Sequence, residues 1–149
     1  MTGAEDNTFA RLTAHLWRGG TVANWFTSTP QPNGNEKKRT VWFEVGRPQP
    51  YPTGKTNVWF GLAPLRQIPP TNAEGKPTKP AHVRSQLVHL EAVNCLFAEY
   101  DRKDYPDGAL GHIVGLAYPP SVLIESSPGS YHAYWLLADT FRLDSPADL

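Results

Sequence analysis

Two short segments carry the residue types that chemistry on phosphates requires, and the first is an acidic pair. Glu99 and Asp101 alternate at the end of an apolar run, Cys95–Asp101, that has the composition of a strand. Alternate side chains of a strand share a face, so both carboxylates fall on one side, with Cα atoms about 6–7 Å apart. That spacing lets them converge on one or two hard cations such as Mg²⁺. The alternative is that the two carboxylates bind no ligand and are simply exposed to solvent where a strand leads into a loop.

The second segment, Ser121–Leu137, indicates two strands joined by a Ser/Pro/Gly turn. Alternation places Ser130, His132 and Tyr134 on one face of the second strand, with His132 close to the turn. Hydroxyl groups from Ser127 and Ser130 flank it, and such a group can hold phosphates by hydrogen bonds or charge. The alternative is a histidine with a purely structural role in an aromatic strand.

The remaining elements follow from periodicity and turn residues. The sequence predicts helices over about 6–18 and 107–116, strands over 21–27, 38–46, 57–64 and 95–101, a hairpin of strands 121–125 and 131–138, and a long exposed loop over 65–84. The nearly continuous apolar run before Glu99 predicts a buried central strand, and function in α/β sheets concentrates at the C-terminal ends of such strands.

The last residues predict a helix start, with Asp144 as its cap, and Asp139 is expected in a turn at the end of the preceding strand. A helix of one turn has no independent stability. We therefore expect residues 1–149 to form one partial domain, truncated after residue 149.

Composition narrows the class of protein. The chain has 149 residues, 40% of them hydrophobic and 19% charged, which is typical of a globular domain. A lone cysteine excludes a disulfide framework, and neither a signal peptide nor a membrane-spanning run is present, so a cytoplasmic protein is expected. Residues 37–84 hold nine basic and two acidic side chains, whereas residues 85–149 hold three basic and nine acidic. This favours a polyanion on the first half and cations on the second, unless the clusters are ordinary surface charge.

In combination, the segments FAEYD (97–101) and SSPGSYHAYW (126–135) resemble the archaeo-eukaryotic primase superfamily, specifically the RepB-like primase or primase–polymerase domains of plasmids and phages. The pair of prolines in PPSVLIESS (119–127) fits the same pattern, and NVWFGLAPLR (57–66) resembles the strand that precedes an arginine in that family. The match covers roughly residues 40–138. The resemblance implies an α/β (α+β) domain with a mixed or antiparallel RRM-like sheet and flanking helices.

The resemblance also implies a function: metal-dependent, template-directed nucleotidyl transfer by a DNA primase or polymerase in plasmid or phage replication. Single-stranded DNA and nucleoside triphosphates would be its partners, together with a replicative helicase domain or protein, and Mg²⁺ or Mn²⁺ its cofactor. The implied metal ligands are Glu99 and Asp101, and the implied triphosphate contacts are Ser127, Ser130, His132, Lys103 and Arg66. The chain departs from the family in having Glu99 where aspartate is usual, and the third acidic residue of the family would fall beyond Leu149.

Two rival functions remain open. The first is a non-catalytic nucleic-acid-binding module of a replication protein on the same sheet. The second is a metal-dependent nuclease or strand-nicking enzyme, which needs a tyrosine nucleophile and usually clustered histidines. The histidines at 82, 89, 112 and 132 lack such clustering, so the binding module ranks ahead of the nuclease.

Overall fold

The structure is a computed structural model that describes residues 5–47, 57–67 and 87–145. The chain divides into two compact units. The first runs to Val93 and also takes in the segment from Thr140, and the second spans Asn94–Asp139. Helices and two antiparallel three-stranded sheets make this an α+β protein, within the mixed fold class that the sequence predicts.

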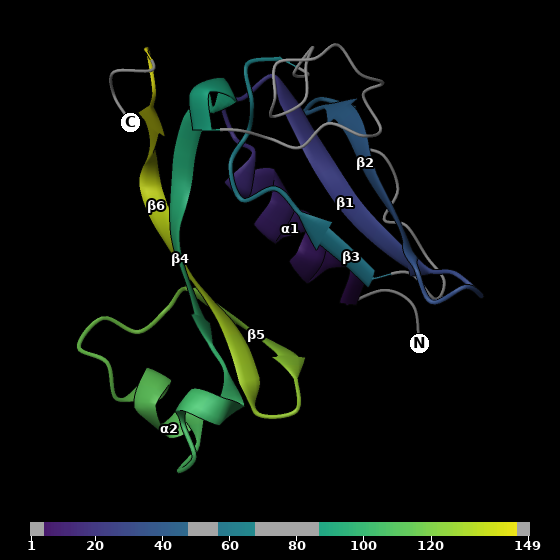
Figure 1. Cartoon of the computed structure of the whole chain (residues 1–149). Coiled ribbons are helices and arrows are strands. Elements are labelled where there is room, and N and C mark those ends of the chain that lie inside the picture. The colour runs from purple at the N-terminus through teal and green to yellow at the C-terminus, as the bar shows by residue number, and fades with distance from the viewer. Residues whose placement is uncertain (1–4, 48–56, 68–86, 146–149) are drawn as a thin grey trace. The chain divides into compact units, whose positions relative to one another are not determined.

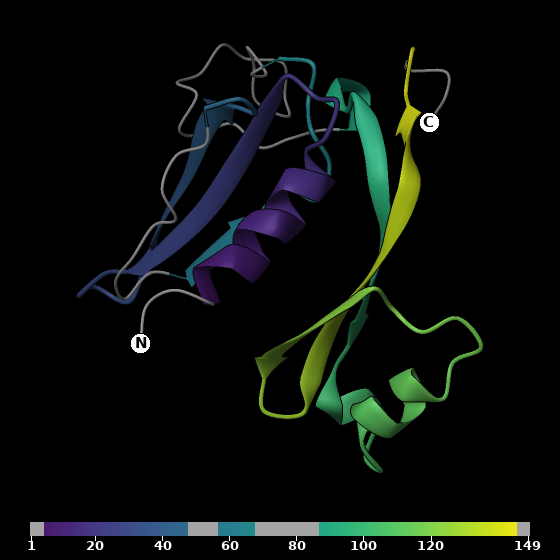
Figure 2. The ribbon, with the colours of Figure 1, turned by 180° about the vertical axis from the view of Figure 1, so that it is seen from behind.

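The first unit packs one helix on one sheet. Its elements are α1 (Glu5–Leu16), β1 (Val22–Pro30), β2 (Glu36–Glu44) and β3 (Asn57–Phe60), and the strand order is β2-β1-β3. Leu12 and Leu16 are buried, as is Trp17 directly after the helix, because their spacing puts them on one face of the chain. Trp17 meets Trp25 of β1 edge to face at 5.3 Å. Figure 2, seen from behind relative to Figure 1, shows α1 lying along the sheet.

The second unit has a sheet in the order β4-β6-β5, built from β4 (Ala92–Tyr100), β5 (Val122–Ser127) and β6 (Ser130–Arg142). A short 3₁₀ turn, η3 (Arg102–Asp104), and α2 (Ala109–Val114) connect β4 to β5. Because β6 inserts between β4 and β5 and runs opposite to both (Figure 1), the arrangement is a split β-α-β unit. This connection is the one found in the first half of an RRM-like sheet.

The core of the second unit lies between α2 and one face of its sheet. Tyr100 of β4 and Ala133 of β6 are buried against Ala109 and Ile113 of α2, and partly buried side chains surround them, among them Leu123. Alternation along β4 and β6 therefore commits Tyr100 and Ala133 to the core and leaves their sequence neighbours on the opposite face. That opposite face carries the acidic pair and the histidine.

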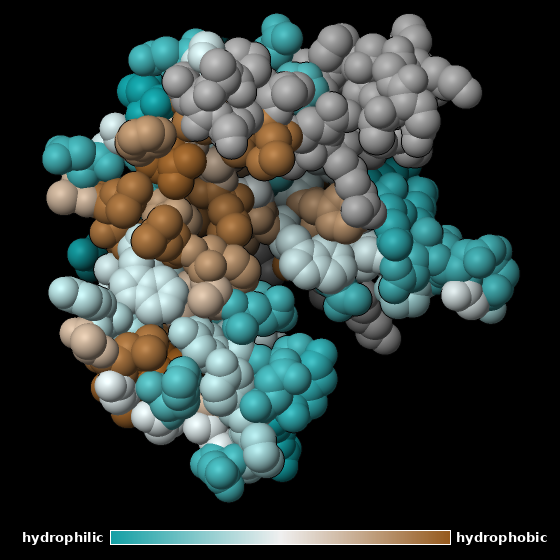
Figure 3. Space-filling view, turned by 60° about the vertical axis from the view of Figure 1, so that its left-hand side comes forward, coloured by the Kyte–Doolittle hydropathy of each residue, from teal (hydrophilic) through white to brown (hydrophobic). Residues whose placement is uncertain are grey.

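Apolar side chains are not confined to this core. Leu96, Leu110 and Val114 remain exposed in the second unit, and hydrophobic surface is visible as brown patches in Figure 3. Exposed apolar residues are common on soluble domains and do not identify a ligand, so the polar groups are the better guide to chemistry. None of the helices in the described ranges is long and apolar enough to cross a membrane.

Several predicted details are wrong. Among the described strands, β4 is an edge strand of its sheet rather than a buried central strand, and Leu96 and Phe97 are exposed on it. Only Ala98 and Tyr100 of this strand belong to the apolar cluster formed with α2. Asp139 lies inside β6, which continues to Arg142, instead of in a turn. The strand predicted over 57–64 ends at Phe60. Most of the predicted loop over 65–84, and the helix predicted after Asp144, lie outside the described residues.

Candidate functional site

The acidic pair sits where β4 ends. Glu99 is the penultimate residue of β4, and Asp101 follows the strand directly with extended backbone angles (φ −76°, ψ 134°). The strand stops there because the chain turns into η3, whose closing hydrogen bond runs from the Asp104 amide to the Asp101 carbonyl. Extended geometry up to Asp101 keeps the predicted alternation, so both carboxylates share the face of Phe97.

β6 places His132 beside Glu99, which joins the two segments that the sequence singled out. His132 Nε2 lies 3.5 Å from a Glu99 carboxylate oxygen. The Phe97 ring meets His132 edge to face at 5.4 Å and lies 5.3 Å from the Tyr134 ring. The face predicted for His132 and Tyr134 is thus the same sheet face as that of Glu99. A half-exposed carboxylate and a partly buried imidazole at this distance form an ion pair whenever the imidazole is protonated.

Asp101 pairs with a lysine from the next turn. Lys103 Nζ lies 2.9 Å from Asp101 Oδ2. Hydrogen bonding to Asp101 and its charge raise the pKa of Lys103 above the ordinary value, and the charges of Asp104 and Glu99 act in the same direction. Lys103 therefore stays protonated at neutral pH and neutralises Asp101. A divalent cation at Asp101 would have to share or displace this ammonium group.

The turn between β5 and β6 is bonded to the end of β4. The Arg102 amide donates to Ser130 Oγ over 3.1 Å, and Ser130 is buried. A phosphate contact of Ser130 stays a prediction; in the structure its hydroxyl oxygen accepts from the end of β4, and Ser130 also lines the hollow beside this turn. The Gly129 amide in turn donates to the Glu125 carboxylate over 2.9 Å, which closes the turn. The serine–glycine segment thus positions the acidic segment.

Gly129 gives the turn a shape that other residues adopt poorly. Its φ of +80° lies in the left-handed region. A Cβ atom at this position would also approach Arg102 Cδ to 3.1 Å. Glycine therefore serves two purposes here: it relieves backbone strain and leaves room for the Arg102 stem to lie against the turn.

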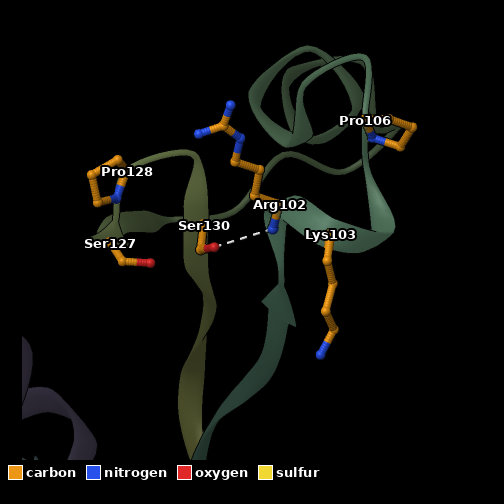
Figure 4. A pocket seen from close by; sticks show the side chains of 6 residues that line it. All are labelled: Arg102, Lys103, Pro106, Ser127, Pro128 and Ser130. Atoms are coloured by element: carbon orange, nitrogen blue, oxygen red, sulfur yellow. Dashed lines mark hydrogen bonds between the residues drawn. The ribbon is translucent and has the colours of Figure 1, made fainter.

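An open hollow of about 630 Å³ lies between this turn and η3 (Figure 4). Its lining consists of two cationic side chains, two hydroxyl groups and two prolines: Arg102, Lys103, Ser127, Ser130, Pro106 and Pro128. In Figure 4 the side chains of Arg102 and Lys103 extend in different directions from the ribbon, one past the Pro128 turn and the other away from it. Cations and hydroxyl groups around a hollow are suited to an anion such as a phosphate group.

Arg102 was missed by the sequence reasoning, although it directly follows the acidic pair. Its side chain is exposed and forms no ion pair with any residue that the structure describes. An arginine without a carboxylate partner at the mouth of a hollow can bind phosphate oxygens through its planar guanidinium group. The basic pair directly after Asp101 was the available signal. Arg66, by contrast, belongs to the first unit, where its amide donates to the His89 carbonyl.

The fit of a divalent metal is partial. Glu99 and Asp101 supply oxygen ligands on one face, and both are accessible enough to reach an ion. No group of three or more histidine, cysteine or acidic side chains that could hold a metal is found in the described ranges. Mg²⁺ is commonly held by one or two carboxylates together with water and substrate phosphates, so this pair would fit an ion that is also held by a phosphate group.

The tyrosine behind the site is not a nucleophile. Tyr134 is almost completely buried, and desolvation, with the nearby Cys95 and Glu99, raises its pKa to about 12. Burial raises the pKa of the Cys95 thiol as well. Both groups are therefore neutral near pH 7 and act as packing residues. This removes Tyr134 from consideration as a nucleophile in strand nicking.

Comparison of the chain with protein-family models, with curated proteins and with solved structures gave no match.

Proposed function

We propose that the chain carries the catalytic segments of a metal-dependent nucleotidyltransferase, a DNA primase or polymerase of the RepB-like type that acts in plasmid or phage replication. One observation carries the proposal: β4 and β6 bring Glu99 next to His132, Asp101 follows on the same side of β4, and a cation-lined hollow lies at the same end of the sheet. A transferase of this class needs a carboxylate side for metal and a donor side for the triphosphate, and both occur here. The resemblance of FAEYD and SSPGSYHAYW to the primase superfamily supports the same conclusion.

In this mechanism the two sides have separate tasks. Glu99 and Asp101 would hold Mg²⁺ or Mn²⁺, which when bound lowers the barrier to attack of a 3′-hydroxyl on the α-phosphate and stabilises the leaving pyrophosphate. His132 would donate to phosphate oxygens from its place beside Glu99. Arg102 and Lys103 would neutralise the remaining triphosphate charge in the hollow, and Ser127 would add a hydroxyl donor.

Ser130 has an indirect role, because it positions the acidic segment. Because its hydroxyl accepts from the Arg102 amide, it fixes the distance between the turn and the acidic segment. The protein would act in the cytoplasm, since plasmid and phage DNA replicates there. The proposed partners are single-stranded DNA template, nucleoside triphosphates and a replicative helicase.

A non-catalytic nucleic-acid-binding module is the second candidate. It is favoured by one observation: each carboxylate of the pair already has a partner, the His132 imidazole for Glu99 and the Lys103 ammonium group for Asp101. A sheet that needs no metal would keep these ion pairs permanently.

Replacing both carboxylates by uncharged amides of the same shape distinguishes the polymerase from the binding module. The whole protein with Glu99→Gln and Asp101→Asn should lose at least about a thousandfold in primer synthesis on single-stranded DNA with Mg²⁺ or Mn²⁺, since several kcal/mol of transition-state stabilisation disappear. The matched control is Asp107→Asn, an exposed acid of the same unit outside the site. Arg102→Gln should weaken nucleoside triphosphate binding while leaving the fold intact.

Three results would count against the proposal. The unsubstituted protein could make no product with either metal. The double variant could retain full synthesis. Finally, both variants could bind nucleotide as tightly as the unsubstituted protein, which would leave the binding module as the better description.

A further inference from the structure

The sheet of the first unit has a second aromatic face, away from α1. Cross-strand partners share a face, so the register assigns each residue to a side: Phe26 pairs with Trp59, and Asn24 pairs with Trp42. Trp25, the neighbour of Phe26, packs against Phe9 of α1 at 5.6 Å. Phe26, Trp42 and Trp59 therefore belong to the face opposite the helix.

Trp59 is the exposed member of this face. It is 46% exposed, whereas Trp25 on the helix side is 3% exposed. The Phe26 and Trp59 rings lie 5.5 Å apart and are tilted by 40°. Phe26 thus supports Trp59 from the central strand. A large indole that is held in place yet half exposed is suited to stack on another flat ring.

Positive charge lies on the neighbouring edge strand. Residues 37–39 of β2 are Lys37, Lys38 and Arg39, and the register places Lys38 opposite Ser28, on the Trp59 face. Lys38 pairs loosely with Glu36 at 3.6 Å, and both side chains are about half exposed. Such an exposed pair contributes little, so the ammonium group is available to a stronger anion. Lys38 and Trp59 lie on strands either side of β1, about 10 Å apart across the sheet.

A polar atom without a partner lies on the same face. Ser28 is buried and its hydroxyl has no hydrogen-bond partner within the described residues. It sits on β1 between Lys38 and the strand of Trp59. Because Ser28 is only 1% exposed, its hydroxyl is closed to a ligand, and the features of this face that a ligand can reach are the half-exposed Trp59 and Lys38.

We propose that this face binds single-stranded nucleic acid, with a base stacked on Trp59 and the phosphate backbone passing Lys38. Aromatic side chains and basic residues on a sheet are the features that single-stranded nucleic acids recognise. Lys38 favours an anionic partner, and the half-exposed indole adds stacking on a flat base, which an acidic protein segment does not offer. The site belongs to the first unit and does not depend on the active-site proposal for the second.

The test is a binding titration of the whole chain with fluorescent oligothymidylate and, separately, oligouridylate. Trp59→Ala should weaken binding about tenfold, the loss of one stacked base, and Trp59→Phe should restore part of it. Lys38→Gln should reduce the slope of log affinity against log salt by about 0.7, the loss of one phosphate contact. Equal losses with both oligomers indicate stacking alone, and a larger loss with one indicates which sugar the face prefers.

Tyr118→Ala is the matched control, because Tyr118 is an exposed aromatic of the second unit, 83% exposed, and should leave affinity unchanged. The Glu99→Gln, Asp101→Asn variant keeps its affinity if the two proposals are independent, and loses synthesis only. Unchanged binding by a folded Trp59→Ala protein would overturn the inference. So would a change in sedimentation behaviour without a change in affinity, since the face would then join copies of the chain.

Discussion

The two sheets have the same design and opposite chemistry. Each has three antiparallel strands with one helix on one face, and in each the helix side is an apolar core. They differ on the other face. In the first unit that face carries Phe26, Trp42 and Trp59 beside a lysine, whereas in the second it carries Glu99 and His132 over Phe97.

The difference shows where each sheet can interact with other molecules. Residues on a helix-covered face are selected for packing, so their side-chain types say little about ligands. On the opposite face a charged or half-exposed aromatic side chain has no packing explanation of the same strength. The acidic face is suited to metal and phosphate, and the aromatic face is suited to bases.

The largest effect is expected when Trp25 and Trp59, on opposite faces of the first sheet, are each replaced by alanine. Trp25 is 3% exposed and touches rings of Phe9, Trp17, Phe43 and Phe60, so Trp25→Ala should cost about 3–5 kcal/mol of unfolding free energy. Trp59→Ala should cost less than about 1 kcal/mol. Denaturant unfolding followed by circular dichroism measures both without relying on the fluorescence of the removed indole.

Trp25→Ala and Trp59→Ala together test whether the two faces of the first sheet differ. Equal destabilisation by the two changes would mean that the face of Trp59 is a second core rather than a binding surface. A large loss for Trp25 alone keeps the two faces distinct.

The next effect concerns pH and the second sheet. Tyr134 has a pKa of about 12 in the folded chain, against an ordinary value of 10, chiefly because it is desolvated. The raised value means that the folded state favours the neutral phenol. Its contribution is fully present below pH 10 and is lost as pH rises from 10 towards 12, about 2–3 kcal/mol in all.

Stability measured between pH 9 and 12 checks this expectation. The unsubstituted chain should lose stability more steeply above about pH 10 than Tyr134→Phe, which has no phenol to ionise. Parallel curves for the two proteins would show that Tyr134 ionises without penalty. Its side of the sheet would then be far better solvated than its burial indicates.

Local patterns predicted much of this molecule. The spacing of Leu12 and Leu16 predicted α1, and the Ser/Pro/Gly turn predicted the β5–β6 hairpin. The 3.5 Å contact of Glu99 with His132 was not predicted, whereas alternation did predict which residues share a face within each strand. These features depend on neighbours in the sequence or on the period of a strand, so composition and spacing are enough.

Features that depend on distant partners were not predicted. The apolar run of β4 did not distinguish a central from an edge strand, because Ala98 and Tyr100 join the cluster with α2 whereas Leu96 and Phe97 are exposed. The contact of Ser130 with the amide of Arg102, 28 residues away, was not predicted either. The same long-range contact brings Arg102 to the hollow, which explains why this arginine was missed.

The smallest effect tests how tightly the turn positions Arg102. Gly129→Ala should cost about 1–2 kcal/mol from the left-handed backbone and should also displace the arginine, since its Cβ would lie 3.1 Å from Arg102 Cδ. Gly34→Ala is the matched control, because Gly34 has the same φ of +80° and no atom within 4 Å of the added Cβ. Both variants should lose similar stability, but only Gly129→Ala should bind nucleoside triphosphate severalfold more weakly. Equal nucleotide affinity in the two variants would separate Arg102 from the proposed phosphate site and leave His132 and Lys103 as its candidate hydrogen-bond donors.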